Sequence, residues 1–248
     1  MWTEFLQLPP PALRALLPWI LIGVGFVAQF SGARLLIGRH RQSAAEERTV
    51  TKCPSAPEEE TAAPLLLEMP IDGAHVPTNP ELLPGARRAY RGGEHQGVDF
   101  SCRPGTPVVA AADGWVLSIA DEPDLPKARR DELLGYCKQL GETPPEVLGV
   151  LHGRRVTLCH GLREGQLLTT SYSHLGDVSP DIKPGVRVRQ GDPIGETGAS
   201  GTSHAFGDSR WSELHFEVHL NGVPLGEGLT PQDAGALYRE FLRREVPQ

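Results

Sequence analysis

The stretch DSRWSELHFEVHLN, from Asp208 to Asn221, alternates polar and apolar residues as a β-strand does. Side chains two residues apart point to the same face of an extended chain. One face of this strand would therefore carry four groups that bind protons or metals, namely Glu213, His215, Glu217 and His219. Such a row is either a solvated face of a sheet or part of a metal site.

The chain around this strand is rich in turn-forming residues. Its 248 residues include 28 glycines and 23 prolines, and only 6% are aromatic. Gly and Pro separate short β-prone runs such as GWVLSIA (114–120), RRVTLCH (154–160) and LLTTSYSHL (167–175). We expect a mainly β fold over residues 65–230, a compact antiparallel β-sheet or sandwich-like structure. A net charge of -7 argues against a nucleic-acid-binding surface, so no nucleic acid is expected as a partner.

Two segments of the chain favour helices instead. Residues 121–154 separate two β-prone runs and are long for a plain connection, and helical stretches are predicted from Lys127 to Leu140 and again after Pro144. We read this segment as a helical insertion on a β-hairpin. At the other end, Thr230 suits a helix N-cap, so residues 231–248 are predicted to form a C-terminal helix.

The longest apolar run is ALLPWILIGVGFVAQFSGA, residues 15–33, which are 19 residues without a charge. A run of this length can span a bilayer as a helix. We expect residues 1–33 to be either an uncleaved transmembrane anchor or a signal peptide. A buried core helix is the alternative, but a polar linker, residues 34–64, sets the run apart from the β region.

The four cysteines, Cys53, Cys102, Cys137 and Cys159, form no C-x-x-C pair, so a cysteine-only zinc site is not expected. In an exported chain they could form one or two disulfides. Three full pairings are possible, and the sequence leaves the choice open.

Three short motifs carry groups that suit metal or proton chemistry. GGEHQGVDF places His95 and Asp99 four residues apart, SYSHLGD places His174 at the end of a predicted strand, and ELHFE contains His215. Imidazole nitrogens and carboxylate oxygens are both good zinc ligands. Each motif alone is a weak signal, because polar residues in loops and at strand ends are commonly solvated or structural.

Taken in order, the motifs H-x-G-V-D, Y-S-H-L, G-x-x-I-G-x-T-G-x-S-G and L-H-F-E give a stronger signal. They resemble the lysostaphin-type (LytM, duplicated hybrid motif) zinc endopeptidases, which cleave peptide crosslinks of bacterial peptidoglycan. The resemblance covers roughly residues 70–225. It implies one zinc ion held by His95, Asp99 and His215, with a fourth coordination position open for water. It also implies that His174 orients this water or stabilises the oxyanion.

The sequence departs from the family pattern at one position. Glu213 stands where the family has the first histidine of its H-x-H motif. We expect Glu213 to act as an acid or base, a role that glutamate fills in other zinc proteases. His204, in the long link before the strand, is another source of an imidazole. The expected function is a zinc metalloendopeptidase that cleaves peptidoglycan, and the alternative is a catalytically impaired module that binds cell wall or regulates another hydrolase.

The remaining polar residues are assigned by position. Glu217 is expected to support a metal ligand, His219 to lie at the surface, and His160 to make a structural hydrogen bond near the site. Three histidines outside every motif are expected to be solvated: His40, His75 and His152.

The resemblance also sets expectations for location and partners. The expected partners are peptidoglycan peptides, the membrane through residues 15–33, and a regulatory protein at the 121–154 insertion. That insertion could equally be a specificity element or an inhibitory lid. We expect a cell-envelope protein with its domain on the non-cytoplasmic side, although Arg34, Arg39 and Arg41 favour the opposite orientation by charge.

Overall fold

The computed structural model of the chain describes residue 53 and residues 66–121, 124–163, 165–207 and 210–243. All of them fall within one of two compact units, Glu46–Gln248. The apolar run at 15–33 lies outside the described residues. Among the helices that are described, none is long and apolar enough to cross a membrane.

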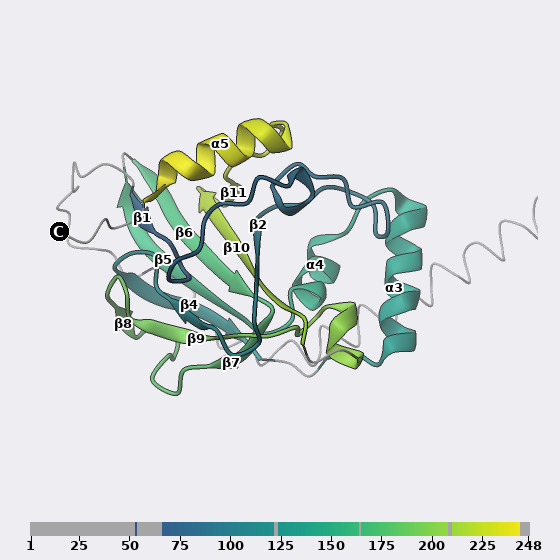
Figure 1. Cartoon of the computed structure of the whole chain (residues 1–248), viewed down its shortest axis with the longest axis horizontal. Coiled ribbons are helices and arrows are strands. Elements are labelled where there is room, and N and C mark those ends of the chain that lie inside the picture. The colour runs from purple at the N-terminus through teal and green to yellow at the C-terminus, as the bar shows by residue number, and fades with distance from the viewer. Residues whose placement is uncertain (1–52, 54–65, 122–123, 164, 208–209, 244–248) are drawn as a thin grey trace, which may run out of the picture. The chain divides into compact units, whose positions relative to one another are not determined.

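The main sheet has seven strands, all paired antiparallel, and it confirms the predicted mainly β fold. Its strands follow the order β11-β10-β6-β5-β4-β8, and β2 also pairs with β10 (Figure 1). The strand that contains LHFEVHL is therefore paired on both sides, with β6 on one side and β2 and β11 on the other. The strands are β2 (Val98–Cys102), β4 (Gly114–Ala120), β5 (Arg155–Arg163), β6 (Gln166–Ser173), β8 (Arg187–Val188), β10 (Ser212–Leu220) and β11 (Val223–Pro224).

A second antiparallel sheet contributes to the same core. It has the order β3-β9-β7, with β3 (Pro107–Val109), β9 (Pro193–Thr197) and β7 (Leu175–Val178). Val108 and Ile194 from this sheet belong to one buried cluster with Leu214 and Phe216 of β10. The core thus joins both sheets, as expected for a sandwich-like fold.

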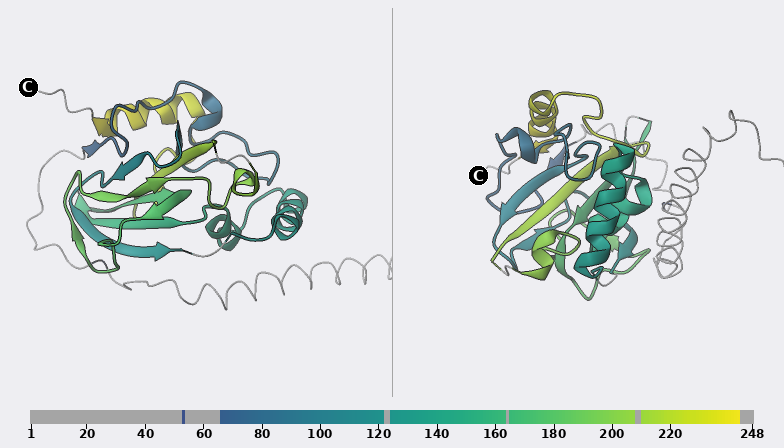
Figure 2. Two further views of the ribbon diagram at one scale, coloured as in Figure 1. Left: turned by 60° about the horizontal axis from the view of Figure 1, so that its bottom comes forward. Right: turned by 90° about the vertical axis from the view of Figure 1, so that its right-hand side faces the viewer.

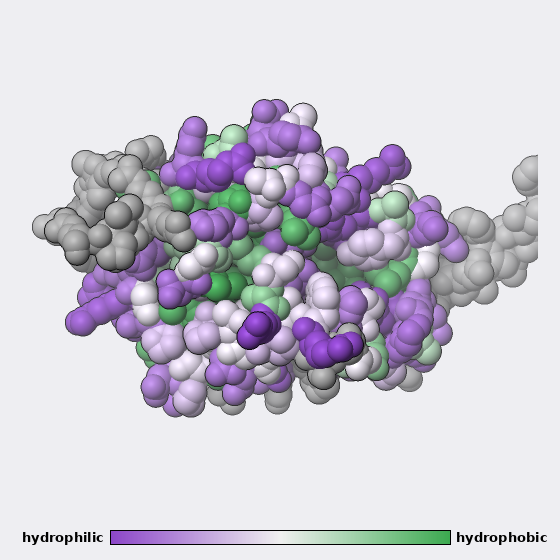
Figure 3. All heavy atoms as spheres, viewed as in Figure 1, coloured by the Kyte–Doolittle hydropathy of each residue, from purple (hydrophilic) through white to green (hydrophobic). Residues whose placement is uncertain are grey.

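Helices cover one side and one end of the sheets. Figure 1 and both views of Figure 2 place α5 along the main sheet and the insertion helices α3 and α4 together beyond the strand ends. The helices are η2 (Pro80–Leu82), α3 (Lys127–Leu140), α4 (Pro145–Leu151), η3 (Ser203–Phe206) and α5 (Pro231–Phe241). Figure 3 shows polar residues over much of the surface around a band of apolar residues in the middle of this face.

The C-terminal helix is shorter than predicted. Thr230 caps its N-terminus as expected, with Oγ1 accepting from the Asp233 N–H at 3.3 Å. The Tyr238 hydroxyl accepts from the Val218 N–H at 3.2 Å, which ties α5 to the main sheet. However, α5 ends at Phe241, because the next two residues form β12 (Leu242–Arg243) and pair in parallel with β1 (Leu67–Glu68).

A disulfide joins the polar linker to the β region. Cys53 is bonded to Cys159, a fully buried residue of β5. Cys102 and Cys137 are free thiols. Of the pairings that the sequence left open, the structure therefore contains one bridge, between residues 106 positions apart.

Candidate metal centre

The polar face of β10 is buried. Leu214, Phe216 and Val218 point into the core, and the alternate residues His215 and Glu217 are each only 4% exposed on the opposite face. The reading of this row as a solvated sheet face is therefore wrong for these two positions. A buried row of ionisable groups needs partners, and the neighbouring strands supply them.

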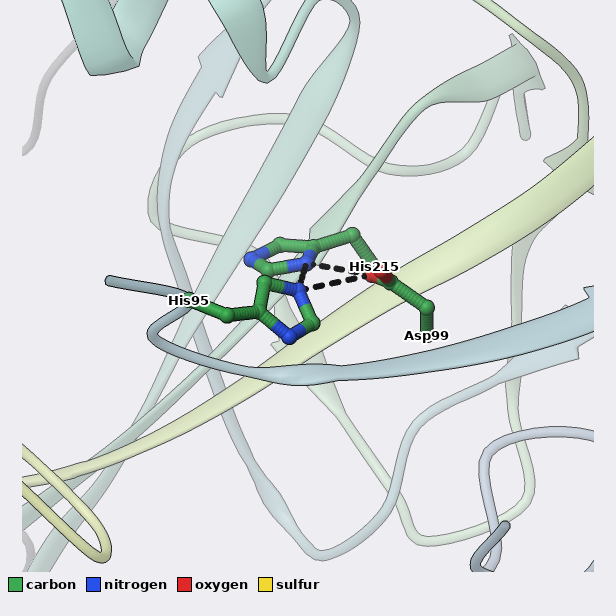
Figure 4. A group of neighbouring side chains, drawn as sticks. All are labelled: His95, Asp99 and His215. Carbon is green, nitrogen blue, oxygen red and sulfur yellow. Dashed lines mark hydrogen bonds and ion pairs between the residues drawn. The ribbon is translucent and has the colours of Figure 1, made fainter. Parts of the chain in front are cut away.

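Three side chains converge on one point (Figure 4). Asp99 lies opposite His215 in the register between β2 and β10, and His95 comes from the loop before β2. His95 Nε2 lies 3.0 Å from both Asp99 Oδ1 and His215 Nδ1, and the latter two atoms are 2.7 Å apart. Ligand atoms about 2.0–2.2 Å from a tetrahedral zinc ion lie roughly 3.3 Å from one another. The three donor atoms would therefore need to move apart by only a few tenths of an ångström to bind the ion.

Outer hydrogen bonds orient each of these donors. The far nitrogen of His95, Nδ1, is 3.0 Å from the Leu83 carbonyl oxygen and can donate to it. The other oxygen of Asp99, Oδ2, accepts from Arg88 Nη2 at 3.0 Å. His215 Nε2 is 2.9 Å from Glu217 Oε1. When the outer nitrogens carry the protons, the inner nitrogens are left as lone-pair donors, which is the arrangement that a metal requires.

The charges of the cluster favour a cation at its centre. Burial alone would lower the pKa of His215, but hydrogen bonds and attraction from Asp99 and Glu217 raise this pKa to about 10. Burial would raise the pKa of Asp99, but the adjacent His95 and His215 hold it well below its usual range. The site therefore attracts positive charge between these donors, whether as a proton or as a metal ion. The donor set fits zinc on this ground.

A buried hydroxyl beside the cluster agrees with this fit. Ser173 of β6 lies opposite His215 in the register, so both side chains project from the same face of the sheet. The Ser173 hydroxyl oxygen is buried and has no hydrogen-bond partner. No other buried side-chain oxygen or nitrogen of the described residues lacks a partner in this way. Such an atom usually has a water or ligand as its partner.

His174 is held in an uncommon backbone conformation next to the three donors. Its φ is 62°, in the left-handed region that few residues other than glycine adopt. Its Nδ1 can donate to the Ser200 carbonyl oxygen at 2.8 Å. Burial lowers the pKa of His174 to about 4, so the ring is neutral at pH 7 with Nε2 as an acceptor.

Glu213 reaches the same region from the start of β10. Its Oε1 lies 3.7 Å from His174 Nε2, and its side chain is 12% exposed. Burial, followed by repulsion from the Asp99 carboxylate, raises the pKa of Glu213 to about 8. The structure thus brings together all five residues that the sequence assigns to the site.

One histidine of this region belongs to none of the sequence motifs. His152 was expected to be solvated, and that expectation is wrong, because its side chain is only 12% exposed and its ring stacks on that of His215 at a centroid distance of 4.9 Å. It caps α4 of the insertion, far along the chain from every motif. No local spacing could have indicated this contact.

Other described histidines fall largely where they were expected, and His75 is exposed, whereas His40 lies outside the described residues. His160 contacts the Asp113 carbonyl oxygen at 2.9 Å and Thr170 Oγ1 at 2.8 Å, a structural role. His204 stacks on Trp211 and is not one of the clustered donors. His219 was assigned to the surface, but its side chain is 19% exposed and its Nε2 lies 3.4 Å from Glu217 Oε2, so it is mostly covered.

Comparison with known proteins identifies the domain. Residues 146–226 match the model of peptidase family M23. The chain carries a domain of peptidase family M23. The matched range contains His174, Glu213 and His215, and the motif with His95 and Asp99 lies before it. The lysostaphin-type resemblance is confirmed at the level of the family, and the role of Glu213 stays a prediction.

A relative of this M23 domain is known by sequence. An uncharacterized metalloprotease of Haemophilus influenzae is 35% identical over 128 residues, which are 52% of this chain and 19% of the relative. The aligned part of the chain thus spans about a fifth of the curated relative that it matches.

Three solved structures illustrate how similar this chain is to known folds. A zinc-containing peptidase of Vibrio cholerae is 19% identical, with a TM-score of 0.42, over 73% of this chain and 41% of the other. A putative M23 peptidase of Pseudomonas aeruginosa is 22% identical, with a TM-score of 0.41, over 83% and 60%. Lysostaphin is 20% identical, with a TM-score of 0.33, over 67% and 49%.

Proposed function

We propose that this chain is a zinc-dependent metalloendopeptidase that cleaves peptide crosslinks of bacterial peptidoglycan. The observation that carries the proposal is the convergence of His95 Nε2, Asp99 Oδ1 and His215 Nδ1 within about 3 Å of one another. Two nitrogen donors and one oxygen donor leave a tetrahedral ion one position for water or substrate, as catalytic zinc sites do. Zinc, when bound, would supply a Lewis acid that polarises the peptide carbonyl and activates water.

His174 is the residue proposed to orient the attacking water. Its Nδ1 is engaged by the Ser200 carbonyl oxygen, and its Nε2 lies 3.7 Å from Glu213 Oε1, with the ring centroid 5.7 Å from that of His215. A neutral imidazole in this orientation accepts a hydrogen bond from water. If the ring gains a proton during the reaction, the same atom can donate to the oxyanion of the tetrahedral intermediate.

Glu213 is the proposed acid and base. An ionised carboxylate at this position can accept a proton from water and return it to the leaving amine of the cleaved peptide bond. Burial raises the pKa of Glu213 to about 8, which disfavours the ionised form, whereas a divalent cation held at the three donors would favour it. A loaded metal centre would therefore increase the fraction of Glu213 that is ionised, and able to act as a base, at neutral pH.

One observation favours the second reading, a module that binds cell wall without cutting it. The resemblance implies that Glu213 stands in place of a family histidine, and an ionised carboxylate cannot donate a hydrogen bond to an oxyanion. Digestion of purified peptidoglycan, with release of new amino termini measured beside zinc content, separates the two. Zinc without release of amino termini would leave only the binding role.

Location and partners belong to the same proposal. We place the domain on the non-cytoplasmic side of a membrane, joined through residues 15–33, because the proposed substrate lies there. A disulfide between Cys53 and Cys159 supports an oxidising compartment. The 121–154 insertion is the proposed contact for a regulatory protein. A reporter fused after Gln248 that is active only in the cytoplasm would contradict this location and the substrate with it.

A further inference from the structure

The helical insertion ends against the candidate metal centre. His152 follows α4 as its C-cap residue, and its ring packs on the His215 ring with an angle of 29° between the planes. Both side chains are largely covered, at 12% and 5% exposure. A residue of the insertion thus lies on the face of a proposed zinc ligand.

The same ring also approaches the carboxylate that orients this ligand. His152 Nε2 lies 3.6 Å from Glu217 Oε1, the oxygen that His215 Nε2 contacts at 2.9 Å. The other carboxylate oxygen, Oε2, faces His219 Nε2 at 3.4 Å. Because Oε1 lies beside both rings, the position of His152 constrains the carboxylate that determines which nitrogen of His215 is free for a metal.

The backbone of His152 reaches the other side of the site. Its carbonyl oxygen accepts from the His174 N–H at 2.9 Å. The adjacent Gly153 approaches Ser200 so closely that a Cβ there would lie 2.3 Å from the Ser200 carbonyl carbon. Ser200 in turn holds His174 Nδ1 through its carbonyl oxygen. One short segment therefore contacts both the proposed ligand His215 and the proposed catalytic residue His174.

We infer that His152 is a positioning residue of the metal centre, which holds Glu217 against His215 so that His215 Nδ1 faces the ion. This inference rests on the proposed zinc-dependent function. His152, His215 and Glu217 also place ligand atoms within 4.8 Å of one another. A separate ion there would need His215 Nε2 without its proton, whereas the set with His95 and Asp99 uses Nδ1 and leaves the proton on Nε2. His152 and Glu217 therefore support the metal centre of His95, Asp99 and His215 and do not form a second metal site.

The test compares zinc affinity in variants of the full-length chain, measured by competition with a chromophoric chelator. His152→Ala removes the ring, and His152→Phe keeps a flat ring on His215 but removes the ring nitrogen that lies 3.6 Å from Glu217 Oε1. We expect zinc binding to weaken by roughly 10–100-fold in His152→Ala and at least several-fold in His152→Phe. His75→Ala is the control, because His75 is an exposed histidine outside the cluster, and this variant should bind zinc within about twofold of the wild type.

A second readout separates positioning from simple packing. Cobalt(II) substituted for zinc reports ligand geometry through its visible absorption bands, and these should change in both His152 variants but not in His75→Ala. If His152→Ala does not fold, as judged by thermal unfolding of the metal-free chain, His152→Phe carries the test. Both His152 variants binding zinc within twofold of the wild type, with unchanged cobalt spectra, would overturn the inference alone. A wild-type chain that binds no zinc would overturn the proposed function as well.

Discussion

Asp99 and His215 are cross-strand neighbours on β2 and β10, and their side chains meet with Oδ1 and Nδ1 2.7 Å apart. Backbone hydrogen bonds of the sheet set the separation of these two donors before any metal binds. Only His95 comes from a loop, and the Leu83 carbonyl oxygen holds its ring at 3.0 Å. The centre is therefore largely preorganised by the fold.

Removal of any one of these donors should abolish tight zinc binding. The wild-type chain should contain close to one zinc per molecule by elemental analysis, and His95→Ala, Asp99→Ala and His215→Ala should each contain little, because two ligands hold zinc weakly. His75→Ala, at an exposed position outside the cluster, is the control and should retain the metal. Equal zinc in all four variants would show that the ion binds elsewhere.

Substitution of Glu213 should affect turnover without affecting zinc content. Glu213→Gln keeps the shape of the side chain but cannot take a proton, so peptidoglycan cleavage should fall by roughly a hundredfold or more. Glu213→His, which introduces the residue that the resemblance implies for this position, should retain activity. If the wild type is inert and Glu213→His cleaves, the natural protein is a zinc-bearing binder and the enzyme assignment fails.

The fold should lose stability in mild acid through His160. Burial lowers the pKa of His160 to about 4 in the folded chain, below the ordinary value of 6.5, so the unfolded chain binds the proton first. The free energy of unfolding should be unaffected by this residue above pH 6.5 and should fall by roughly 3 kcal/mol as the pH drops to about 4.

Denaturant unfolding of the metal-free chain and of His160→Gln across this pH range measures the effect. The variant should be less stable at pH 7, because hydrogen bonds to Asp113 and Thr170 are altered, but its stability should depend less on pH. Parallel pH curves for the two proteins would contradict the assignment.

A methyl group at Gly201 should disturb the loop that holds His174. Gly201 has a φ of +75°, and a Cβ there would lie 2.3 Å from the Leu151 carbonyl oxygen. The left-handed backbone alone costs a non-glycine residue roughly 1–2 kcal/mol, and the backbone clash adds to this. Gly201→Ala should therefore lower the melting temperature and the cleavage rate. Gly207→Ala, where a Cβ meets nothing within 4 Å, should do neither.

Much of the site follows from short-range sequence patterns. His95 and Asp99 lie four residues apart, and the period of two along β10 places His215 and Glu217 on one face whatever the rest of the fold does. The turn-rich β pattern similarly predicts the antiparallel sheets. These inferences use contacts between residues that are close in sequence or that share a strand.

Contacts between distant segments could not be predicted in this way. His152 reaches His215 only because the insertion folds back onto the main sheet, and Cys53 pairs with Cys159 across 106 positions. The predicted C-terminal helix is longer than the observed one, because the sequence pattern of the helix does not reveal that Leu242 pairs with Leu67. In each case the deciding partner lies in a segment whose position only the tertiary structure determines.

The disulfide between Cys53 and Cys159 limits how far the proposed tether can reach. With this bond closed, the spacer between the apolar run and the domain is residues 34–52, which are 19 residues and extend to at most about 65 Å. Reduction of the bond would free the linker up to residue 64, which is 31 residues and about 105 Å when fully extended. With the proposed anchor and the proposed substrate, the oxidised chain would reach only cell wall close to the membrane surface, and its reduced form would reach a deeper layer.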